Sequence, residues 1–265
     1  MHVAITGASS GIGAALAREF SARGHAVTLV ARRADLLHQV AASLPGKAHV
    51  AVADLSDVPR ATSFIAGAEA ALGPIDVLIN NAGVQIVGPT SEVSPEAGEQ
   101  LLAVDLLSPL RLTQAVLPAM LARRSGTIVD IASMAALAPT PGMTHYNAAK
   151  AGLAAASEAL RGELRGSGVH VVTVYPGIIA STEMARAALT KYEPSKVLAA
   201  FPRGTEEVLA TLVHRAVVRR QARVIYPRSG VLSRWFPGAT RWFVDRFTPK
   251  LVAASGSSRA AALPA

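Results

Sequence analysis

The chain has 265 residues, 51% hydrophobic and 17% charged, a balance that suits a well-buried core of one large or two small domains and excludes a disordered chain. It contains no cysteine, which excludes disulfides, thiolate catalysis and cysteine-ligated metals and is compatible with a reducing cytosol. The net charge of +8 resides in residues 201–265, with 11 Lys/Arg against 3 Asp/Glu, whereas residues 1–200 hold 15 of each, so this distribution does not indicate nucleic-acid binding.

Short apolar runs alternate with segments of helical periodicity along the whole chain. The runs predict strands, in chain order, at residues 3–5, 27–30, 50–53, 77–79, 127–131, 169–174 and 224–226. The periodic segments predict helices at residues 12–21, 35–44, 58–72, 95–123, 146–165 and 205–219, with Ser94 and Pro95 starting the fourth and Pro109 kinking its middle. This alternation predicts an α/β fold of the Rossmann type, a doubly wound parallel sheet of about seven strands with helices on both faces.

The ends of the chain carry expectations about location. Residues 1–7 enter the first predicted strand at once and leave no room for a signal peptide, and no uninterrupted apolar run is long enough for a transmembrane helix. We therefore expect a cytoplasmic protein. Residues 255–265 are small, polar or Ala-rich and are expected to be a disordered tail.

A glycine-rich turn follows the first strand and opens the first helix, in Thr6-Gly7-Ala8-Ser9-Ser10-Gly11-Ile12-Gly13. Glycines let the backbone approach a pyrophosphate closely, and the helix N-terminus supplies free N–H donors. The spacing is G-x-x-x-G-x-G. A plain strand-to-helix connection is the alternative, but strand, turn and helix all occur where phosphate binding needs them. We predict a nucleotide site at Gly7, Ser9, Ser10, Gly11, Ile12 and Gly13.

The end of the second strand indicates which nucleotide binds. NAD sites place an acidic residue there for the ribose hydroxyls, whereas a basic residue accommodates the 2′-phosphate of NADP. This chain has Arg32 and Arg33 and no acid. Two solvated arginines at a helix start would not explain the missing acid, so the sequence favours NADP (NADPH).

Tyr146 and Lys150 are four residues apart on a predicted helix, which puts both side chains on one face. A lysine ammonium beside a phenol favours the phenolate and lowers the tyrosine pKa, so that the tyrosine can exchange a proton near neutral pH. The spacing alone is weak evidence, because many helices carry such a pair by chance.

Further motifs follow in order along the chain. Asn80-Asn81-Ala82-Gly83 follows the fourth strand, Ser133 ends the fifth, Tyr146 and Lys150 form Y-x-x-x-K, and Pro176-Gly177 with Thr182 follows the sixth. With these motifs the chain resembles the short-chain dehydrogenase/reductase family from residue 3 to about residue 226. The resemblance implies cofactor contacts at Asp54, Leu55, Asn81, Ala82, Gly83, Tyr146, Lys150, Pro176, Gly177, Ile179 and Thr182. We expect no metal site.

The resemblance also implies catalytic roles. Tyr146 would be the general acid in reduction and the base in oxidation, Ser133 would polarise the substrate oxygen, and Lys150 would lower the tyrosine pKa and bind the nicotinamide ribose. One position departs from the family, because Asp105 stands where an asparagine usually helps hold a water behind the lysine. Asp105 is expected to be the fourth catalytic member, with an altered proton supply as the open question.

The substrate side is less explicit in the sequence. Residues 85–87, 134–135, 140–143 and 178–201 would form a mostly apolar wall that includes Ile86, Val87, Met134, Met143, Leu189 and Tyr192. The wall favours an apolar ketone or aldehyde, lipid-like or steroid-like, with reduction as the expected direction. His145 either touches this substrate or is an ordinary partly exposed histidine.

Residues 229–254 form a basic, aromatic extension beyond a domain at residues 1–228. The extension holds both tryptophans, Trp235 and Trp242, and a short helix is expected between Pro237 and Pro249. Three interpretations stay open: a lid or dimer contact, a peripheral membrane anchor, or packing on the chain's own domain.

The leading hypothesis is an NADP(H)-dependent oxidoreductase that acts on an apolar carbonyl or secondary alcohol. The alternatives are a non-catalytic NADP-binding sensor or scaffold, and an epimerase or dehydratase of the extended branch, against which glycine spacing and chain length argue. The resemblance implies a homodimer or homotetramer formed through the fourth and fifth helices, where small residues would permit close approach: Ala148, Ala151, Gly152, Ala155, Ala156 and Ala159.

Overall fold

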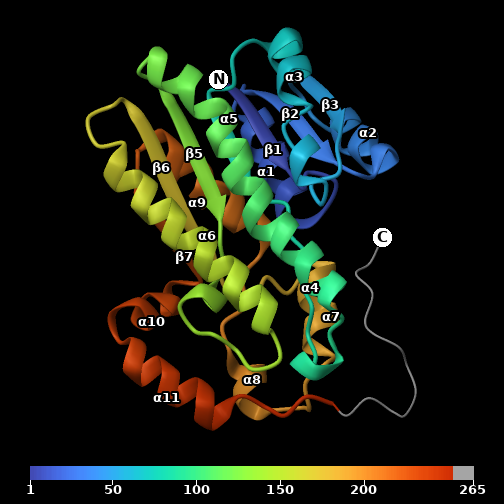
Figure 1. Ribbon diagram of the computed structural model, residues 1–265, viewed down its shortest axis with the longest axis vertical. Helices are drawn as coiled ribbons and strands as arrows, with labels where there is room; N and C mark the ends of the chain where they lie inside the picture. Colours follow the sequence, from blue (N-terminus) through green and yellow to red (C-terminus); the bar gives the residue numbers. More distant parts are fainter. Residues whose placement is uncertain (253–265) are drawn as a thin grey trace.

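The seven predicted strands form one parallel sheet in the computed structural model, which describes residues 1–252 (Figure 1). Across the sheet the order is β3 (Ala48–Val52), β2 (Ala26–Ala31), β1 (His2–Thr6), β4 (Val77–Asn80), β5 (Gly126–Ile131), β6 (Val169–Pro176) and β7 (Arg223–Tyr226), and every pairing is parallel. The order reverses between β1 and β4, and ligands bind outside the carboxyl ends of strands at such a point. The predicted Rossmann-type fold is confirmed.

Helices cover both faces of the sheet (Figure 1). One face packs against α1 (Gly11–Ala22), α2 (Ala34–Ala42) and α9 (Glu206–Val218), and the other against α3 (Ile65–Leu72), α5 (Ser108–Ala122) and α6 (Thr144–Glu163). Each face has its own apolar core, with Leu16 and Val213 fully buried on the first and Leu112 and Met120 on the second. Burial of such a side chain stabilises the fold by about 1.5–3 kcal/mol, so the two cores hold the strand ends in place.

The helix predicted at residues 58–72 is wrong in its first half. Val58–Arg60 forms a 3-10 turn, and the regular helix α3 begins only at Ile65. Asp57 accepts a hydrogen bond from the Arg60 N–H and so caps a tight turn, while Pro59 supplies no N–H of its own. Further 3-10 turns lie at Thr90–Glu92, Met134–Ala136 and Arg228–Gly230.

The helical segment after β4 differs from a simple kinked helix. The predicted cap is confirmed, because Ser94 accepts from the Ala97 N–H at 3.2 Å and Pro95 begins α4 (Pro95–Leu102). A π turn at Ala103–Leu107 then separates α4 from α5. Pro109 has no N–H to give to the carbonyl of residue 105, so the chain takes a wider turn just before the proline.

The combined stretch Pro95–Ala122 is long and apolar enough, by length and composition, to cross a membrane. This differs from the expectation drawn from the sequence. However, Leu101, Leu112 and Met120 are fully buried in the protein core. The stretch therefore acts here as a core helix.

Four helices lie beyond the carboxyl ends of the strands, at the lower end of the molecule in Figure 1: α7 (Glu183–Leu189), α8 (Lys196–Ala200), α10 (Val231–Trp235) and α11 (Pro237–Phe247). We call residues 178–204 and 227–252 the cap. The helix expected between Pro237 and Pro249 is confirmed as α11. The domain boundary at residue 228 stays a prediction, and residues 253–254 of the extension and the expected tail at 255–265 lie outside the described residues.

Candidate active site

The glycine-rich turn after β1 packs against the residues that follow β4 and is hydrogen-bonded to them. A Cβ on Gly7, whose φ is +67°, would lie 2.8 Å from the Ala82 Cα, and a Cβ on Gly13 would lie 2.1 Å from the Gly7 carbonyl oxygen. Side chains at these two positions would therefore collide with backbone. The Asn81 amide donates to the Thr6 carbonyl at 2.8 Å, and the Thr6 hydroxyl accepts from the N–H groups of Asn81 and Ala82. Asn81 and Ala82 thus support the turn.

The N-terminus of α1 is suited to an anion. The helix begins at Gly11, its first turn carries no acidic residue, and the Ser10 side chain does not cap it. The first N–H groups of the helix can therefore face a pyrophosphate. A Cβ on Gly11 would lie 3.4 Å from the Thr182 methyl group, so the segment after β6 also reaches this turn.

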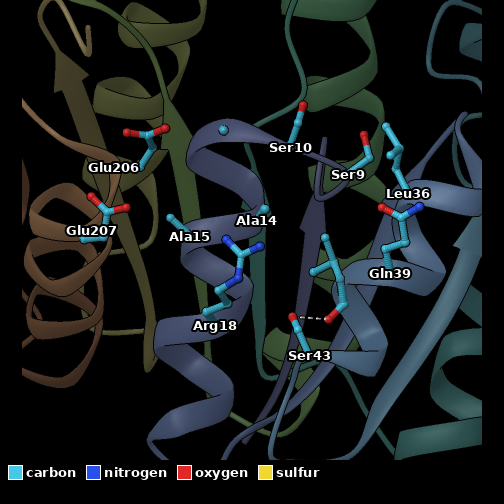
Figure 2. Close-up of a pocket in the computed structure, with 12 residues that line it drawn as sticks. Ser9, Ser10, Ala14, Ala15, Arg18, Leu36, Gln39, Ser43, Glu206 and Glu207 are labelled. Carbon is cyan, nitrogen blue, oxygen red and sulfur yellow. Dashed lines mark hydrogen bonds between the residues drawn. The ribbon is translucent and has the colours of Figure 1, made fainter. Parts of the chain in front are cut away.

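A basic group lies across the hydroxyls of the same turn. Arg33 Nη2 donates to Ser9 Oγ at 3.1 Å and to Ser10 Oγ at 2.9 Å. Ser9 and Ser10 border a hollow of about 250 Å³ between α1, α2 and the start of α9 (Figure 2). Its lining is completed by Gly11, Ala14, Ala15, Arg18, Leu36, Gln39, Val40, Ser43, Glu206 and Glu207.

Of the two predicted cofactor residues after β3, Asp54 is exposed and Leu55 is buried. Asp54 is exposed and accepts from the Ser56 N–H and hydroxyl at 2.9 and 2.8 Å. The partial loss of water around the carboxylate opposes its ionisation. The two Ser56 hydrogen bonds and the charge of Arg32 outweigh that effect and lower the pKa of Asp54. Leu55 is buried in the core and its carbonyl accepts from the Ser108 hydroxyl at 2.6 Å, so its side chain is not presented to a cofactor.

Tyr146, Lys150 and Ser133 meet at the carboxyl end of β5. The Lys150 ammonium lies 5.8 Å from the centre of the Tyr146 ring and donates to the Ile131 carbonyl at 3.1 Å. Ser133 accepts from the Ala135 N–H at 3.1 Å. Because that bond uses the oxygen only as an acceptor, the Ser133 hydroxyl can donate its proton to the Tyr146 oxygen, with which it is hydrogen-bonded. The predicted triad is therefore assembled in space.

The predicted direction of the tyrosine pKa is wrong for this structure. Burial raises the pKa of Tyr146 more than the Lys150 charge and the Ser133 hydrogen bond lower it, and the charge of Asp105 raises it further. The effect of Lys150 itself has the expected sign. Its field is offset by the carboxylate behind it.

That carboxylate, Asp105, forms a buried ion pair with Lys150. Asp105 Oδ2 lies 3.2 Å from Lys150 Nζ in a contact not aligned as a hydrogen bond, and Oδ1 accepts from the Val84 N–H at 2.7 Å. Burial raises the pKa of Asp105 despite the ammonium, whereas for Lys150 the carboxylate outweighs burial and raises the pKa. A Cβ on Gly83 would lie 3.0 Å from Asp105 Oδ2 and 3.3 Å from Lys150 Nζ, so any larger residue there would press on the pair.

The π turn explains why Asp105 reaches the lysine. The turn lies where α4 passes into α5, and Asp105 within it is fully buried. Such π turns commonly occur at functional sites because they redirect one side chain. Asp105, the predicted fourth catalytic residue, thus lies behind Lys150.

The segment after β6 also lies at the carboxyl edge of the sheet. Gly177 donates to the Tyr226 carbonyl at 2.7 Å, directly after Pro176 at the end of β6. Ile179 is 3% exposed and packs in the core, and Thr182 caps α7 by accepting from the Ala185 N–H. Thr182 is therefore brought to the glycine-rich turn, while the Ile179 side chain is not presented to a ligand.

Comparison with known proteins agrees with this geometry. A family model described as short chain dehydrogenase matches residues 1–193. The chain belongs to this family. A fatty acyl-CoA reductase of Mycobacterium tuberculosis is 34% identical over 236 residues, which are 87% of this chain and 77% of the relative. The first three curated relatives are matched over 59%, 77% and 64% of their own lengths.

Solved structures share the fold. A short-chain dehydrogenase from Streptomyces avermitilis superposes with a TM-score of 0.78 at 29% identity, covering 92% of this chain and 94% of its own. A metagenomic short-chain oxidoreductase in complex with NADP has a TM-score of 0.69 at 31% identity, covering 85% and 96%. The protein is an oxidoreductase of the short-chain dehydrogenase family with a Rossmann-type fold.

Apolar side chains of this short-chain dehydrogenase surround the tyrosine. Ile86, Leu101 and Met143 pack in one cluster with Tyr146, and the Gln85 amide contacts Met143 Sδ at 3.1 Å. Tyr192 closes one side by donating to the Pro141 carbonyl at 2.8 Å. These contacts fit the predicted apolar wall.

The predicted wall residue Met134 and the separate candidate His145 both pack against glycines. Met134 packs toward Gly177 and Gly230, and the His145 ring packs against Gly98 of α4, where a Cβ would lie 2.6 Å from it. His145 is therefore explained by packing. Within residues 1–252, no group of three or more His, Asp or Glu side chains is arranged to hold a metal ion.

Sequence reasoning missed two groups that position the site. Thr6 connects the glycine turn to the end of β4, and Asn80 donates to Asp130 Oδ1 at 2.8 Å and so ties β4 to β5. Their positions in the sequence could have identified them, because Thr6 directly precedes Gly7 and Asn80 directly precedes Asn81. A polar side chain at the end of a buried strand needs a partner, which the neighbouring strand end supplies.

Proposed function

We propose that this oxidoreductase uses NADP(H) to interconvert the carbonyl and secondary alcohol of an apolar substrate, with Tyr146 as general acid and base. The observation that carries the proposal is the convergence of Tyr146, Lys150 and Ser133 at the carboxyl edge of the parallel sheet, the edge at which the glycine turn after β1 also lies. NADP rather than NAD is supported by Arg33, which lies on the hydroxyls of Ser9 and Ser10.

The chain's own groups would divide the chemistry as follows. NADPH, when bound, supplies the hydride. The Tyr146 hydroxyl gives its proton to the substrate oxygen during reduction and takes it back during oxidation. The Ser133 hydroxyl donates a hydrogen bond to the same oxygen. Lys150 stabilises the phenolate that forms, and Asp105 and the Ile131 carbonyl hold its ammonium in position.

The raised pKa of Tyr146 suits the reductive direction. A phenol that holds its proton at neutral pH is ready to act as an acid, whereas oxidation needs the phenolate. The apolar cluster of Ile86, Leu101 and Met143 around the phenol supports an apolar substrate. The reductase name of the mycobacterial relative, which specifies a fatty acyl substrate, points the same way.

The test is NADPH oxidation with a panel of apolar ketones and aldehydes, repeated with Tyr146→Phe. Loss of the proton donor should lower the rate by roughly 100- to 10,000-fold, while the affinity for NADPH stays the same. A rate that survives this substitution contradicts the mechanism. NADPH binding without turnover of any substrate by the wild-type protein would instead favour a sensor or scaffold.

We also propose that the chain forms a homodimer or homotetramer through the outer faces of Pro95–Ala122 and α6. Ala148 and Ala155 are exposed on α6, and Leu107 and Leu121 are exposed on the neighbouring stretch, 47% and 39% respectively. Small residues permit close helix approach. Light scattering of wild type and Ala155→Arg tests this, since a bulky charge should yield monomers; an unchanged mass contradicts it.

A further inference from the structure

The outermost helices of the cap expose an unusual amount of aromatic surface. Nine of the fifteen large apolar side chains exposed in residues 1–252 lie in the cap, so this exposure is concentrated at one end of the molecule. The most exposed are Trp235 at 71%, Trp242 at 64%, Leu232 at 63% and Phe236 at 60%. We call these four, with Phe201, Phe243 and the partly exposed Phe247, the aromatic surface. Clustered exposed apolar side chains of this kind mark interaction sites.

Several of these rings form a contiguous group. Phe243 lies 6.0 Å from Phe201 and 4.8 Å from Phe247, and Trp242 lies 5.9 Å from Phe247, measured between ring centres. No residue of α10 or α11 is buried. The rings therefore pack on one another at the surface.

The aromatic surface is held in place by polar contacts with the rest of the fold. Arg234 of α10 pairs with Glu158 of α6 at 3.0 Å, and Arg241 of α11 donates to the Pro139 carbonyl at 2.7 Å. Leu251 packs against Gly142 and pairs with Tyr192. These tethers fix α10 and α11 with their rings outward, at the end of the molecule where the strands also terminate (Figure 1).

The charge around the rings identifies the partner. Residues 227–252 contain five Lys/Arg and one Asp, a net charge of +4. Arg228, Arg246 and Lys250 are exposed, and Arg246 lies over the Phe247 ring at 5.6 Å. A twofold contact between two copies would place these like charges against each other, whereas an anionic lipid surface complements them. Tryptophan and phenylalanine beside arginine and lysine are also the residues that enter the headgroup region.

We propose that the aromatic surface docks peripherally on membranes that contain anionic lipids, with the aromatic rings in the headgroup region and Arg228, Arg246 and Lys250 on the lipid phosphates. The contact requires no catalytic turnover, so it is independent of the proposed reaction. It selects the membrane among the three interpretations that the sequence left open for residues 229–254.

The chain offers a specific reporter, because its two tryptophans both lie on this surface. Full-length protein is mixed with vesicles of phosphatidylcholine alone or phosphatidylcholine with phosphatidylserine. Tryptophan emission should shift to the blue and the protein should co-sediment only with the anionic vesicles, and added salt should weaken binding. Absence of both the shift and co-sedimentation would overturn the proposal.

Matched variants separate this surface from general stickiness. Trp235→Ser with Trp242→Ser should lower co-sedimentation at least tenfold. Val52→Ser with Val218→Ser, which alters apolar side chains exposed elsewhere at 58% and 59%, should not. Arg246→Gln should weaken binding and the exposed Arg60→Gln should not. Equal effects of both pairs would contradict the proposal. If the wild-type protein self-associates without binding vesicles, and only the tryptophan variant is monomeric, the surface would be a contact with a second copy instead.

Discussion

The sheet with its covering helices, residues 1–177 and 205–226, is built by different rules from the cap, and we call it the nucleotide-binding half after its proposed role. Helices α1, α5 and α9 bury several residues each, whereas α7, α10 and α11 bury none. The family model matches residues 1–193 and so ends inside the cap. Binding a pyrophosphate and placing a hydride acceptor require fixed backbone positions, but a wall for an apolar molecule requires only shape and low polarity. The first demand leaves motifs in the sequence and the second does not.

Gly13→Ala is expected to have the largest effect on the stability and the cofactor affinity of the nucleotide-binding half. A methyl group there would lie 2.1 Å from the Gly7 carbonyl oxygen, so the glycine turn must move. We expect the free energy of unfolding to fall by about 1–3 kcal/mol. Displacement of the helix N–H groups should weaken NADPH binding by roughly tenfold to a hundredfold, measured by calorimetric titration.

Gly67→Ala is the matched control for that substitution. Gly67 lies in α3 and a Cβ there would meet no atom within 4 Å. An alanine in such a helix position should raise stability by about 0.5–1 kcal/mol and leave NADPH affinity unchanged. If both alanines weaken the cofactor equally, steric closeness at Gly13 is not the reason for its glycine.

Arg33→Ala tests the choice of cofactor in the same half. The guanidinium lies on Ser9 Oγ and Ser10 Oγ, where a 2′-phosphate would gain a charge-assisted hydrogen bond of about 1.5–3 kcal/mol. Its loss should raise the KM for NADPH by roughly tenfold to a hundredfold and leave the KM for NADH unchanged. The exposed Arg60→Ala serves as the control, and a parallel rise for both cofactors would argue against phosphate recognition.

The sequence predicted the sheet, and several of the candidate site residues could be placed because they follow a strand or lie near the start of a helix. Ser133, Gly177 and Tyr146 are far apart in the chain, yet parallel strands bring their carboxyl ends to one edge. The π turn at Ala103–Leu107 could not be predicted, since it results from Pro109 and from the packing of Asp105 together. The net direction of the Tyr146 pKa was also missed, because it depends on burial and on the carboxylate behind Lys150.

Glu158→Gln tests how the cap is attached. Glu158 lies within 3.2 Å of Arg161, Arg223 and Arg234, and the hydrogen bonds from Arg223 are the main reason that its pKa is lowered to about 2 from 4.5. A lowered carboxyl pKa stabilises the fold above the ordinary pKa, and this contribution is lost as the pH falls through about 2. The variant should lose about 1–3 kcal/mol at neutral pH and less under acid.

Urea denaturation followed by tryptophan fluorescence measures this effect, since Trp235 and Trp242 both lie in the cap. The control is Glu163→Gln, an exposed glutamate near the end of the same helix. We expect the cap signal to change at lower urea than the circular dichroism of the sheet in Glu158→Gln only. Coincident transitions would mean that the cap and the sheet unfold as one unit despite the difference in burial.

Asp105→Asn is expected to have the smallest effect, and it changes the carboxylate that pairs with Lys150. An amide oxygen at this position can still accept from the Val84 N–H, so the π turn should persist. Lys150 should stay protonated at neutral pH, because its ammonium still donates to the Ile131 carbonyl and the charge of Asp130 still raises its pKa against burial. Without the opposing carboxylate, the ammonium acts on Tyr146 undiminished, and the pKa of Tyr146 falls relative to wild type.

The sign of the kinetic consequence follows from the two directions of catalysis. Reduction needs the protonated phenol and oxidation needs the phenolate, so both pH profiles should move to lower pH in Asp105→Asn. The maximal rates should change by less than about tenfold, since the acid-base group itself remains. Profiles measured in both directions check this. A shift to higher pH would mean that the buried lysine loses its proton once its carboxylate is removed, and that Asp105 keeps Lys150 charged rather than restraining its field at the tyrosine.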